Sequence, residues 1–186
     1  MALIPVLVSG GIHLDGFADT VDALSSYGDR EKKMEILKDP NTGAFAVIGL
    51  CAYFLTDTAL WSEVTMELLP VIACTYMFSR SLSGISVVTF RAAKNSGLLR
   101  TFQDGAQRKR VRAVLILWAC ACGGIMLYLS WKTAVIVILA ALLAFLYYYR
   151  MSRKQFGGIT GDLAGYFLQV CELAMLAGAV LSRGMR

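Results

Sequence analysis

Long apolar stretches separated by short polar ones make up most of this chain of 186 residues. The apolar stretches are Ala44 to Trp61, Leu68 to Val88, Val111 to Leu129, Thr133 to Tyr149 and Leu163 to Leu181. Each is close to the roughly 20 residues that an α-helix needs to cross a bilayer. The pattern predicts an all-α, polytopic membrane helix bundle with about five full spanning helices.

Two further segments precede the first long apolar stretch. "MALIPVLVSGG" is apolar but too short to span, and it lacks the basic region and the cleavage site of a signal peptide. We interpret it as a partial helix whose beginning is missing. Gly28 to Gly43 is charged, and Pro40 and Gly43 should stop any helix there. It predicts an aqueous loop or a surface helix.

Composition supports a membrane location. The chain is 57% hydrophobic and only 17% charged, whereas soluble domains are about 25% charged, and its mean hydropathy is +0.60. The five cysteines lie inside apolar stretches without CxxC spacing, so we interpret them as packing residues rather than a disulfide framework or a zinc site. We expect residues 1–186 to form a single integral-membrane catalytic domain.

The basic residues indicate an orientation. With alternating crossings, Arg30 to Lys38, Arg91 to Arg112 and Arg150 to Lys154 face the same side, and 15 of the 18 Lys and Arg residues lie there when Arg80, near its helix end, is counted. The exceptions are Lys132, Arg183 and Arg186. The positive-inside rule then predicts that this side is cytoplasmic, in a bacterial or archaeal inner membrane. Membrane orientation explains the net charge of +5 without a nucleic-acid partner.

A cluster of acidic residues lies in "GGIHLDGFADTVDAL", Gly10 to Leu24. Asp15, Asp19 and Asp22 would share one face of a helix, where like charges repel unless a cation compensates them. Hard oxygen ligands favour Mg²⁺, Mn²⁺ or Ca²⁺, and carboxylates at a membrane boundary are functional candidates. The alternatives are a solvated acidic face and, for His13, a role as a base, a substrate contact or a satisfied polar residue.

A second candidate is "FGGITGDLAGYFLQVCEL", Phe156 to Leu173. Its glycines allow close backbone approach, and Asp162 begins a polar stripe that runs along an apolar helix to Glu172. Asp162 could also be an ordinary helix cap. The segment lacks the lysine and the spacing of a phosphate-binding P-loop.

Cations near the same end could neutralise a phosphoanhydride. The candidates are Lys38, Arg80 in "SRSLSG" and Lys94 in "RAAKNSGLLRTF", although each could instead be a topological anchor, as we expect for the "RKRVR" cluster. Asp57 lies close to the outer end of its stretch, so we interpret it as interfacial and structural.

Together with "REKKMEILKDPNTGAFAVI" and "AAKNSGL", these segments closely resemble the cobalamin synthase family, also called adenosylcobinamide-GDP ribazoletransferase. The H-x-D-G-x-x-D-x-x-D and G-G-x-T-G-D-x-x-G arrangements both recur in the family's order, from about Leu3 onward. Ala23 stands where glycine is expected, and Pro40 stands where serine is usual. The family's first membrane segments, about a quarter of its usual length, have no counterpart in this resemblance.

The resemblance implies an enzyme of the last assembly step of cobalamin biosynthesis. The substrates would be adenosylcobinamide-GDP and α-ribazole or its 5′-phosphate, and the products would be adenosylcobalamin or its phosphate and GMP. We expect a ribose 5′-hydroxyl to attack the phosphorus attached to cobinamide. Such a step depends on positioning and charge neutralisation, in the lipid bilayer and with Mg²⁺ as cofactor.

The resemblance also implies roles for the candidate residues. The aspartates would hold Mg²⁺ against the diphosphate, and one of them or His13 would accept the hydroxyl proton. The expected catalytic residues are His13, Asp15, Asp19 and Asp22, the last three as metal ligands. The expected substrate-binding residues are Lys38, Arg80, Lys94, Gly158, Thr160, Gly161, Asp162 and Glu172, and Asp162 and Glu172 could instead complete the metal site.

Two alternative functions remain open at this stage. A CDP-alcohol phosphatidyltransferase also uses clustered aspartates, but its D-G-x-x-A-R element is absent here. A non-enzymatic carrier or ion pathway would use Asp57, Asp162 and Glu172 as relay groups, yet it predicts charges spread through the membrane depth. The sequence leaves open the oligomeric state, a homo-oligomer included, and the number of metal ions.

Overall fold

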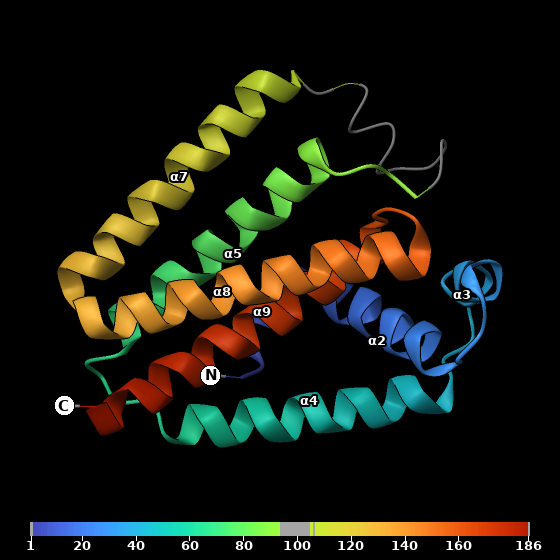
Figure 1. The fold of residues 1–186 in the computed structure, drawn as a ribbon. Coiled ribbons are helices and arrows are strands. Elements are labelled where there is room, and N and C mark those ends of the chain that lie inside the picture. Colours follow the sequence, from blue (N-terminus) through green and yellow to red (C-terminus); the bar gives the residue numbers. More distant parts are fainter. Residues whose placement is uncertain (1, 94–104, 106, 186) are drawn as a thin grey trace.

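The computed structural model describes residues 2–93, 105 and 107–185, which form helices packed side by side (Figure 1). The helices are α1 (Ile4–Ser9), α2 (Ile12–Ser25), α3 (Arg30–Ile36), α4 (Ala44–Ser62), α5 (Leu69–Thr89), α7 (Arg108–Leu129), α8 (Trp131–Met151), the π-helical turn η1 (Ser152–Phe156), α9 (Gly161–Leu181) and the 3₁₀ turn η2 (Ser182–Met185). The described residues contain no β-strand, only a parallel bridge between Ala92 and Ile159. The predicted all-α bundle is confirmed.

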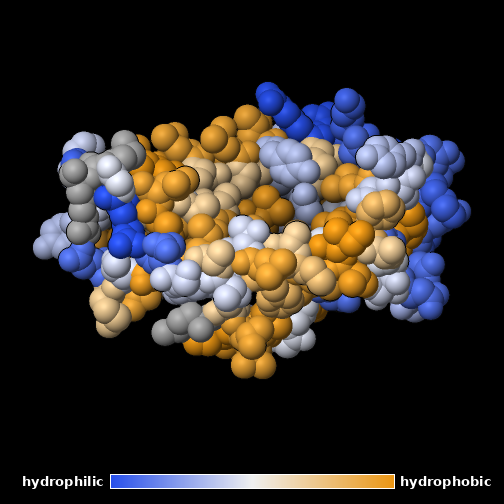
Figure 2. All heavy atoms as spheres, turned by 90° about the horizontal axis from the view of Figure 1, so that it is seen from below, coloured by the Kyte–Doolittle hydropathy of each residue, from blue (hydrophilic) through white to orange (hydrophobic). Residues whose placement is uncertain are grey.

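Five helices in the described part of the chain are long and apolar enough to cross a membrane. They are α4, α5, α7, α8 with its continuation η1, and α9. The bounds of the five α-helices lie within three residues of the predicted stretches, and η1 extends α8 beyond its predicted end to Phe156. Figure 2 shows hydrophobic residues over the middle of one face and hydrophilic residues at both ends. This distribution matches a bilayer with an aqueous phase on each side.

α9 lies in the middle of the bundle and packs against α2, α4, α5 and α8. It is the most buried of the five spans, and Phe167, Cys171 and Met175 of its core face are inaccessible. α4 and α7 bury few of their residues. Most of the surface of these two helices is therefore available to lipid.

The predicted N-terminal partial helix is α1. Gly10 and Gly11 end it with φ angles of 64° and 80°, left-handed values that glycine adopts without steric cost. α2 begins directly after this break, so it follows a direction different from that of α1. The break allows the aspartate-bearing helix to pack along α9.

The basic loops meet at one end of the bundle, where Figure 1 places α3, the end of α5 and the connection from α8 to α9. Lys33 of α3 donates to Gln155 Oε1 over 2.6 Å. The Ala93 nitrogen donates to the Ile159 carbonyl and the Ile159 nitrogen donates to the Arg91 carbonyl, both over 2.9 Å. These contacts join three segments that are far apart in the sequence into what we call the basic end.

Candidate active site

Three aspartates lie on one side of α2, as their spacing of four and three residues predicts. Asp15 is exposed, whereas Asp19 and Asp22 are half-buried. The other side of α2 buries apolar side chains, among them Leu14 and Phe17, and packs against α4 and α9. Burial of that face holds the carboxylates at the basic end.

Asp162, in the first turn of α9, lies beside these three aspartates. The backbones of α2 and α9 approach so closely that a Cβ on Gly16 would lie 2.7 Å from the Asp162 carbonyl oxygen. Burial raises the pKa of Asp19 to about 6, and the negative charges of the other three aspartates add to this effect. We call Asp15, Asp19, Asp22 and Asp162 the carboxylate cluster.

The Asp22 carboxylate lies against Gly43, the residue that precedes the first turn of α4. A Cβ at Gly43 would overlap this carboxylate. The N-terminal end of a helix carries partial positive charge and stabilises a nearby anion. Glycine at this position therefore leaves room for the Asp22 carboxylate next to the N-terminal end of α4, which stabilises its negative charge.

The carboxylate cluster presents hard oxygen donors, which Mg²⁺ prefers. In the described part of the chain, no three His, Cys, Asp or Glu side chains lie close enough together to form a complete metal site. Mg²⁺ usually takes only one or two protein carboxylates, with substrate phosphates and water in its other positions. The cluster therefore fits an ion that binds jointly with a phosphorylated substrate.

The loop between η1 and α9 depends on two glycines. Gly157 has a φ of 74°, and the Arg30 guanidinium occupies the place where its side chain would be. At Gly158 a Cβ would lie 2.6 Å from the Ala93 nitrogen. This loop is consequently held between α3 and the segment that follows α5.

Thr160, rather than Asp162, caps α9. Its hydroxyl oxygen accepts a hydrogen bond from the Leu163 nitrogen over 3.2 Å, and the hydroxyl donates to Asp162 Oδ2 over 3.3 Å. The alternative interpretation of Asp162 as the helix cap is therefore wrong. At Gly161, among the described residues, no heavy atom lies within 4 Å of a Cβ position. The helix start thus offers space beside the carboxylate cluster.

His13, in the first turn of α2, is half-buried against α9. A Cβ on Gly165 would lie 3.1 Å from the His13 carbonyl oxygen, so a small residue is needed where the two helices meet. Burial lowers the pKa of His13, and the positive charge of Arg80 lowers it further. His13 is therefore an imidazole that favours its neutral form.

Arg80 of α5 and Glu172 of α9 form an ion pair inside the bundle. Arg80 Nη1 lies 2.5 Å from Glu172 Oε1, and the Ser79 hydroxyl donates to the same oxygen over 2.9 Å. The Glu172 side chain is 8% exposed, whereas that of Arg80 is 37% exposed. Arg80 also donates to the Tyr76 carbonyl over 3.1 Å and lies over the Tyr76 ring. The pair orients an accessible guanidinium within electrostatic range of His13.

Asp57 lies five residues before the outer end of α4. Its side chain is buried at 6% exposure, and it lies within electrostatic range of Glu172 and Tyr53. The polar groups of α4, α5 and α9 therefore extend from the carboxylate cluster into the membrane-spanning part of the bundle.

The remaining cations are less informative. Lys38 is exposed in the turn after α3, and Lys94 lies outside the described residues. Sequence reasoning missed Gly16, Gly43 and Ser79, which each contact a candidate residue. The signal for Gly16 is its place directly after Asp15, but the contacts of Gly43 and Ser79 join segments that no local pattern relates.

The chain matches the family model of cobalamin-5-phosphate synthase over residues 1–180. An adenosylcobinamide-GDP ribazoletransferase of Lachnoclostridium phytofermentans is 44% identical over 182 residues, which cover 98% of this chain and 70% of that protein. Proteins of the same name from Pseudomonas savastanoi and Clostridium botulinum are 36% and 34% identical, over 92% and 96% of this chain and 70% and 71% of their own lengths.

No solved structure matches the chain significantly. The relatives give no support to a CDP-alcohol phosphatidyltransferase or to a carrier. The matched region contains the aspartate helix, the glycine loop and all five candidate spans almost to the end of α9. The chain therefore belongs to the cobalamin-5-phosphate synthase family.

Proposed function

We propose that the chain joins adenosylcobinamide-GDP to α-ribazole or its 5′-phosphate, giving adenosylcobalamin or its 5′-phosphate and GMP. One observation supports this proposal beyond the similarity to named relatives. The carboxylate cluster lies at the basic end, where Asp162 meets α2, and Arg80 is held in a fixed position deeper in the bundle, within electrostatic range of His13. Phosphoryl transfer depends on such positioning and charge neutralisation.

The attacking group follows from the product. A cobalamin 5-phosphate, which the family description names, keeps its 5′-oxygen phosphorylated, so that oxygen cannot be the nucleophile. This corrects the 5′-hydroxyl expected above. Another ribose hydroxyl must attack the phosphorus bound to cobinamide, and the P–O bond to GMP breaks.

We infer that the aspartates of α2 hold Mg²⁺, with Asp162 beside them. The ion would neutralise the diphosphate when bound. Without a cation the four carboxylates repel one another, which is part of the reason for the raised pKa of Asp19. Gly43 places the Asp22 charge at the start of α4 and so fixes one edge of the cluster.

His13 of α2 and Arg80 of α5, which both contact α9, are the proposed partners of the substrate. The His13 imidazole would accept the proton of the attacking hydroxyl, because it is half-buried, lies two residues before Asp15 and belongs to a residue whose backbone packs against Gly165. Arg80, held by Glu172, would interact with a phosphate oxygen. The remaining expected substrate contacts, Lys38, Lys94, Gly158, Thr160 and Gly161, surround the same end of the bundle in our proposal.

The basic end would face the cytoplasm. Both charged substrates would reach the site from that side. The excess of Lys and Arg at this end supports this orientation. Lys132 and Arg183 lie at the opposite end, beside the connection before α8 and after α9.

The test is a reconstituted assay. The chain in proteoliposomes is supplied with adenosylcobinamide-GDP, α-ribazole and Mg²⁺, and cobalamin and GMP are separated by chromatography. Equal amounts of both products are expected, and EDTA should abolish them. Wild-type protein that forms neither product would contradict the proposed function.

Single substitutions separate the proposed roles. Asp15→Asn and Asp19→Asn should each lower the rate by about 100-fold or more, since each removes a proposed metal ligand. Glu35→Gln is the matched control, because it removes one acidic charge from an exposed position on α3. Full activity in both Asp variants would reject the metal assignment but not the transferase activity.

A further inference from the structure

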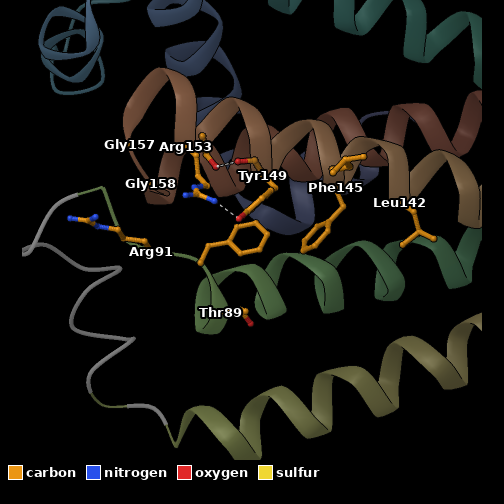
Figure 3. Close-up of a pocket in the computed structure, with 11 residues that line it drawn as sticks. Thr89, Arg91, Leu142, Phe145, Tyr149, Arg153, Gly157 and Gly158 are labelled. Atoms are coloured by element: carbon orange, nitrogen blue, oxygen red, sulfur yellow. Dashed lines mark hydrogen bonds between the residues drawn. The ribbon is translucent and has the colours of Figure 1, made fainter.

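A surface groove lies between α5 and α8 at the basic end (Figure 3). Its volume is about 660 Å³. Apolar and aromatic side chains of α8 line one part of it, among them Leu142, Phe145 and Tyr149. The lining also includes Arg91, Arg153 and the glycine loop at Gly157 and Gly158, which form its outer end.

The groove changes character along α8. Leu142, Phe145, Tyr149 and Arg153 follow one another at helical spacing, and Figure 3 shows them as a row that ends near Arg91. At 1.5 Å per residue, this row is about 16 Å long. That is about half of the roughly 30 Å hydrocarbon core. The groove therefore extends from the middle of the membrane to its basic surface.

The groove also opens sideways. Leu142 and Leu146 are 47% and 42% exposed, although both belong to a helix that is apolar enough to span the membrane. At this depth the surrounding medium is lipid, so an acyl chain can enter without crossing water. A nucleotide in the same place would bring its charged phosphate groups into contact with these leucines, which is unfavourable.

Two guanidinium groups lie at the outer end of the groove. Arg153 donates to the Tyr149 hydroxyl over 2.5 Å and lies 5.3 Å from the centre of the Tyr149 ring, which orients it. A guanidinium has five N–H donors. The donors of Arg153 that do not bind Tyr149 are available to hydrogen-bond an anion. The Arg91 backbone is fixed by the hydrogen bond from Ile159. Figure 3 shows the Arg91 side chain extending away from Arg153. Arg153 therefore suits a phosphate group directly, and Arg91 adds positive charge at the same end of the groove.

We propose that this groove binds an anionic phospholipid. The phosphate contacts Arg153 and is attracted by the positive charge of Arg91, and one acyl chain lies along Leu142 and Phe145. Because Gly157 and Gly158 line the same groove, the bound lipid also supports the loop that leads to Thr160 and Asp162. This binding does not depend on the proposed transferase activity.

The test measures lipid retention by the whole chain. Protein in dodecyl maltoside is titrated with dioleoyl phosphatidylglycerol or dioleoyl phosphatidylcholine, and bound lipid is counted by native mass spectrometry. Each basic residue beside an anionic lipid contributes about fivefold in affinity. Arg91→Gln with Arg153→Gln should therefore lower phosphatidylglycerol binding by about 20-fold, with little change for phosphatidylcholine.

Two comparisons make this result specific. Arg110→Gln with Arg112→Gln removes the same charge from exposed positions of α7 outside the groove, and its lipid binding should stay within about twofold of wild type. Leu142→Trp keeps both arginines but fills the apolar part, and it should weaken dioleoyl phosphatidylglycerol more than the short-chain dihexanoyl form. Circular dichroism and size-exclusion profiles verify that each variant is folded.

Several results would overturn the lipid site. One is an equal loss of phosphatidylglycerol binding in the α7 control, which would indicate attraction by net charge alone. Another is unchanged binding in the Arg91 and Arg153 variant. A third is displacement of the lipid by GDP together with loss of GDP binding in that variant, which would assign the groove to the nucleotide of the substrate.

Discussion

Gly43 illustrates how one residue without a side chain positions a charged one. The Asp22 carboxylate fills the space beside Gly43, at the start of α4. An acidic residue in this place gains from the partial positive charge of the helix end. From the sequence, Gly43 is only a loop residue, because the contact with Asp22 depends on how α2 packs against α4.

Gly43→Ala should reduce activity by about tenfold or more, because a Cβ would displace the Asp22 carboxylate, and small misplacements in an active site are costly. The measurement is the rate of cobalamin formation at saturating Mg²⁺. Gly124→Ala on α7 is the control, since a Cβ there has no heavy atom within 4 Å among the described residues. Equal rates for the two variants would contradict a role for the Asp22 position.

The pKa of Asp19 predicts a pH dependence of stability in the metal-free chain. Its folded pKa of about 6 lies above its ordinary value of 3.8. Asp19 therefore stabilises the fold most below about pH 4, and this contribution is lost as the pH rises through 6.

In EDTA, the Tm of the wild type should thus fall by a few degrees relative to that of Asp19→Asn between pH 4 and pH 7. Thermal unfolding in detergent, followed by circular dichroism, measures both proteins. A wild-type Tm that rises relative to the variant over this range would show that the Asp19 carboxylate is stabilised, not destabilised, by its surroundings.

At the scale of elements, the positions of the spanning helices were predictable and their contacts were not. Apolar length belongs to a single segment, so the bounds of α4 and α9 followed from local composition. The contact between Arg80 and Glu172 joins residues 92 positions apart. It depends on the rotation of α5 relative to α9, and many rotations would bury the same apolar area.

The same limit applies to the candidate site. The helical spacing of the aspartates on α2 is a local property, and the sequence predicted it. The close approach of Gly16 to Asp162 arises from packing between α2 and α9, and so does the contact of Gly165 with His13. The turn η1 was not predicted, and its hydrogen bond with α3, from Lys33 to Gln155, joins segments that no local pattern relates.

The ion pair between α5 and α9 should couple the two helices. Arg80→Gln leaves the buried Glu172 without its cation and should destabilise the fold by about 2 kcal/mol, less than a fully buried pair would because Arg80 is partly exposed. Glu172→Gln should cost less, since it leaves the more accessible partner. The double variant should be more stable than Arg80→Gln alone.

Thermal unfolding of the four proteins measures this coupling. Lys32→Gln supplies the comparison, because Lys32 forms an ion pair with Glu35 in which both side chains are more than half exposed, at 62% and 68%. Exposed pairs of this kind contribute about 0.5 kcal/mol or less. Additive effects of the Arg80 and Glu172 substitutions would mean that the pair contributes no coupling.

The whole molecule has its proposed active site toward one end and its apolar surface between two polar ends (Figure 2). The carboxylate cluster, the glycine loop and the outer part of the groove all lie at the basic end. This asymmetry requires a defined orientation, because soluble substrates can reach the site from one side only. The excess of Lys and Arg at that end predicts that it faces the cytoplasm.

Cysteine labelling of membrane vesicles tests this orientation. In a background in which the five native cysteines are replaced by serine or alanine, Asn41→Cys places a thiol at the basic end and Lys132→Cys places one at the opposite end. A membrane-impermeant maleimide should label position 132 in right-side-out vesicles and position 41 in inverted vesicles. The reverse pattern would put the carboxylate cluster outside the cell, where neither the charge distribution nor the supply of nucleotide-activated substrate would fit. Labelling of both positions from both sides in intact vesicles would mean mixed insertion, so the basic loops would not determine orientation.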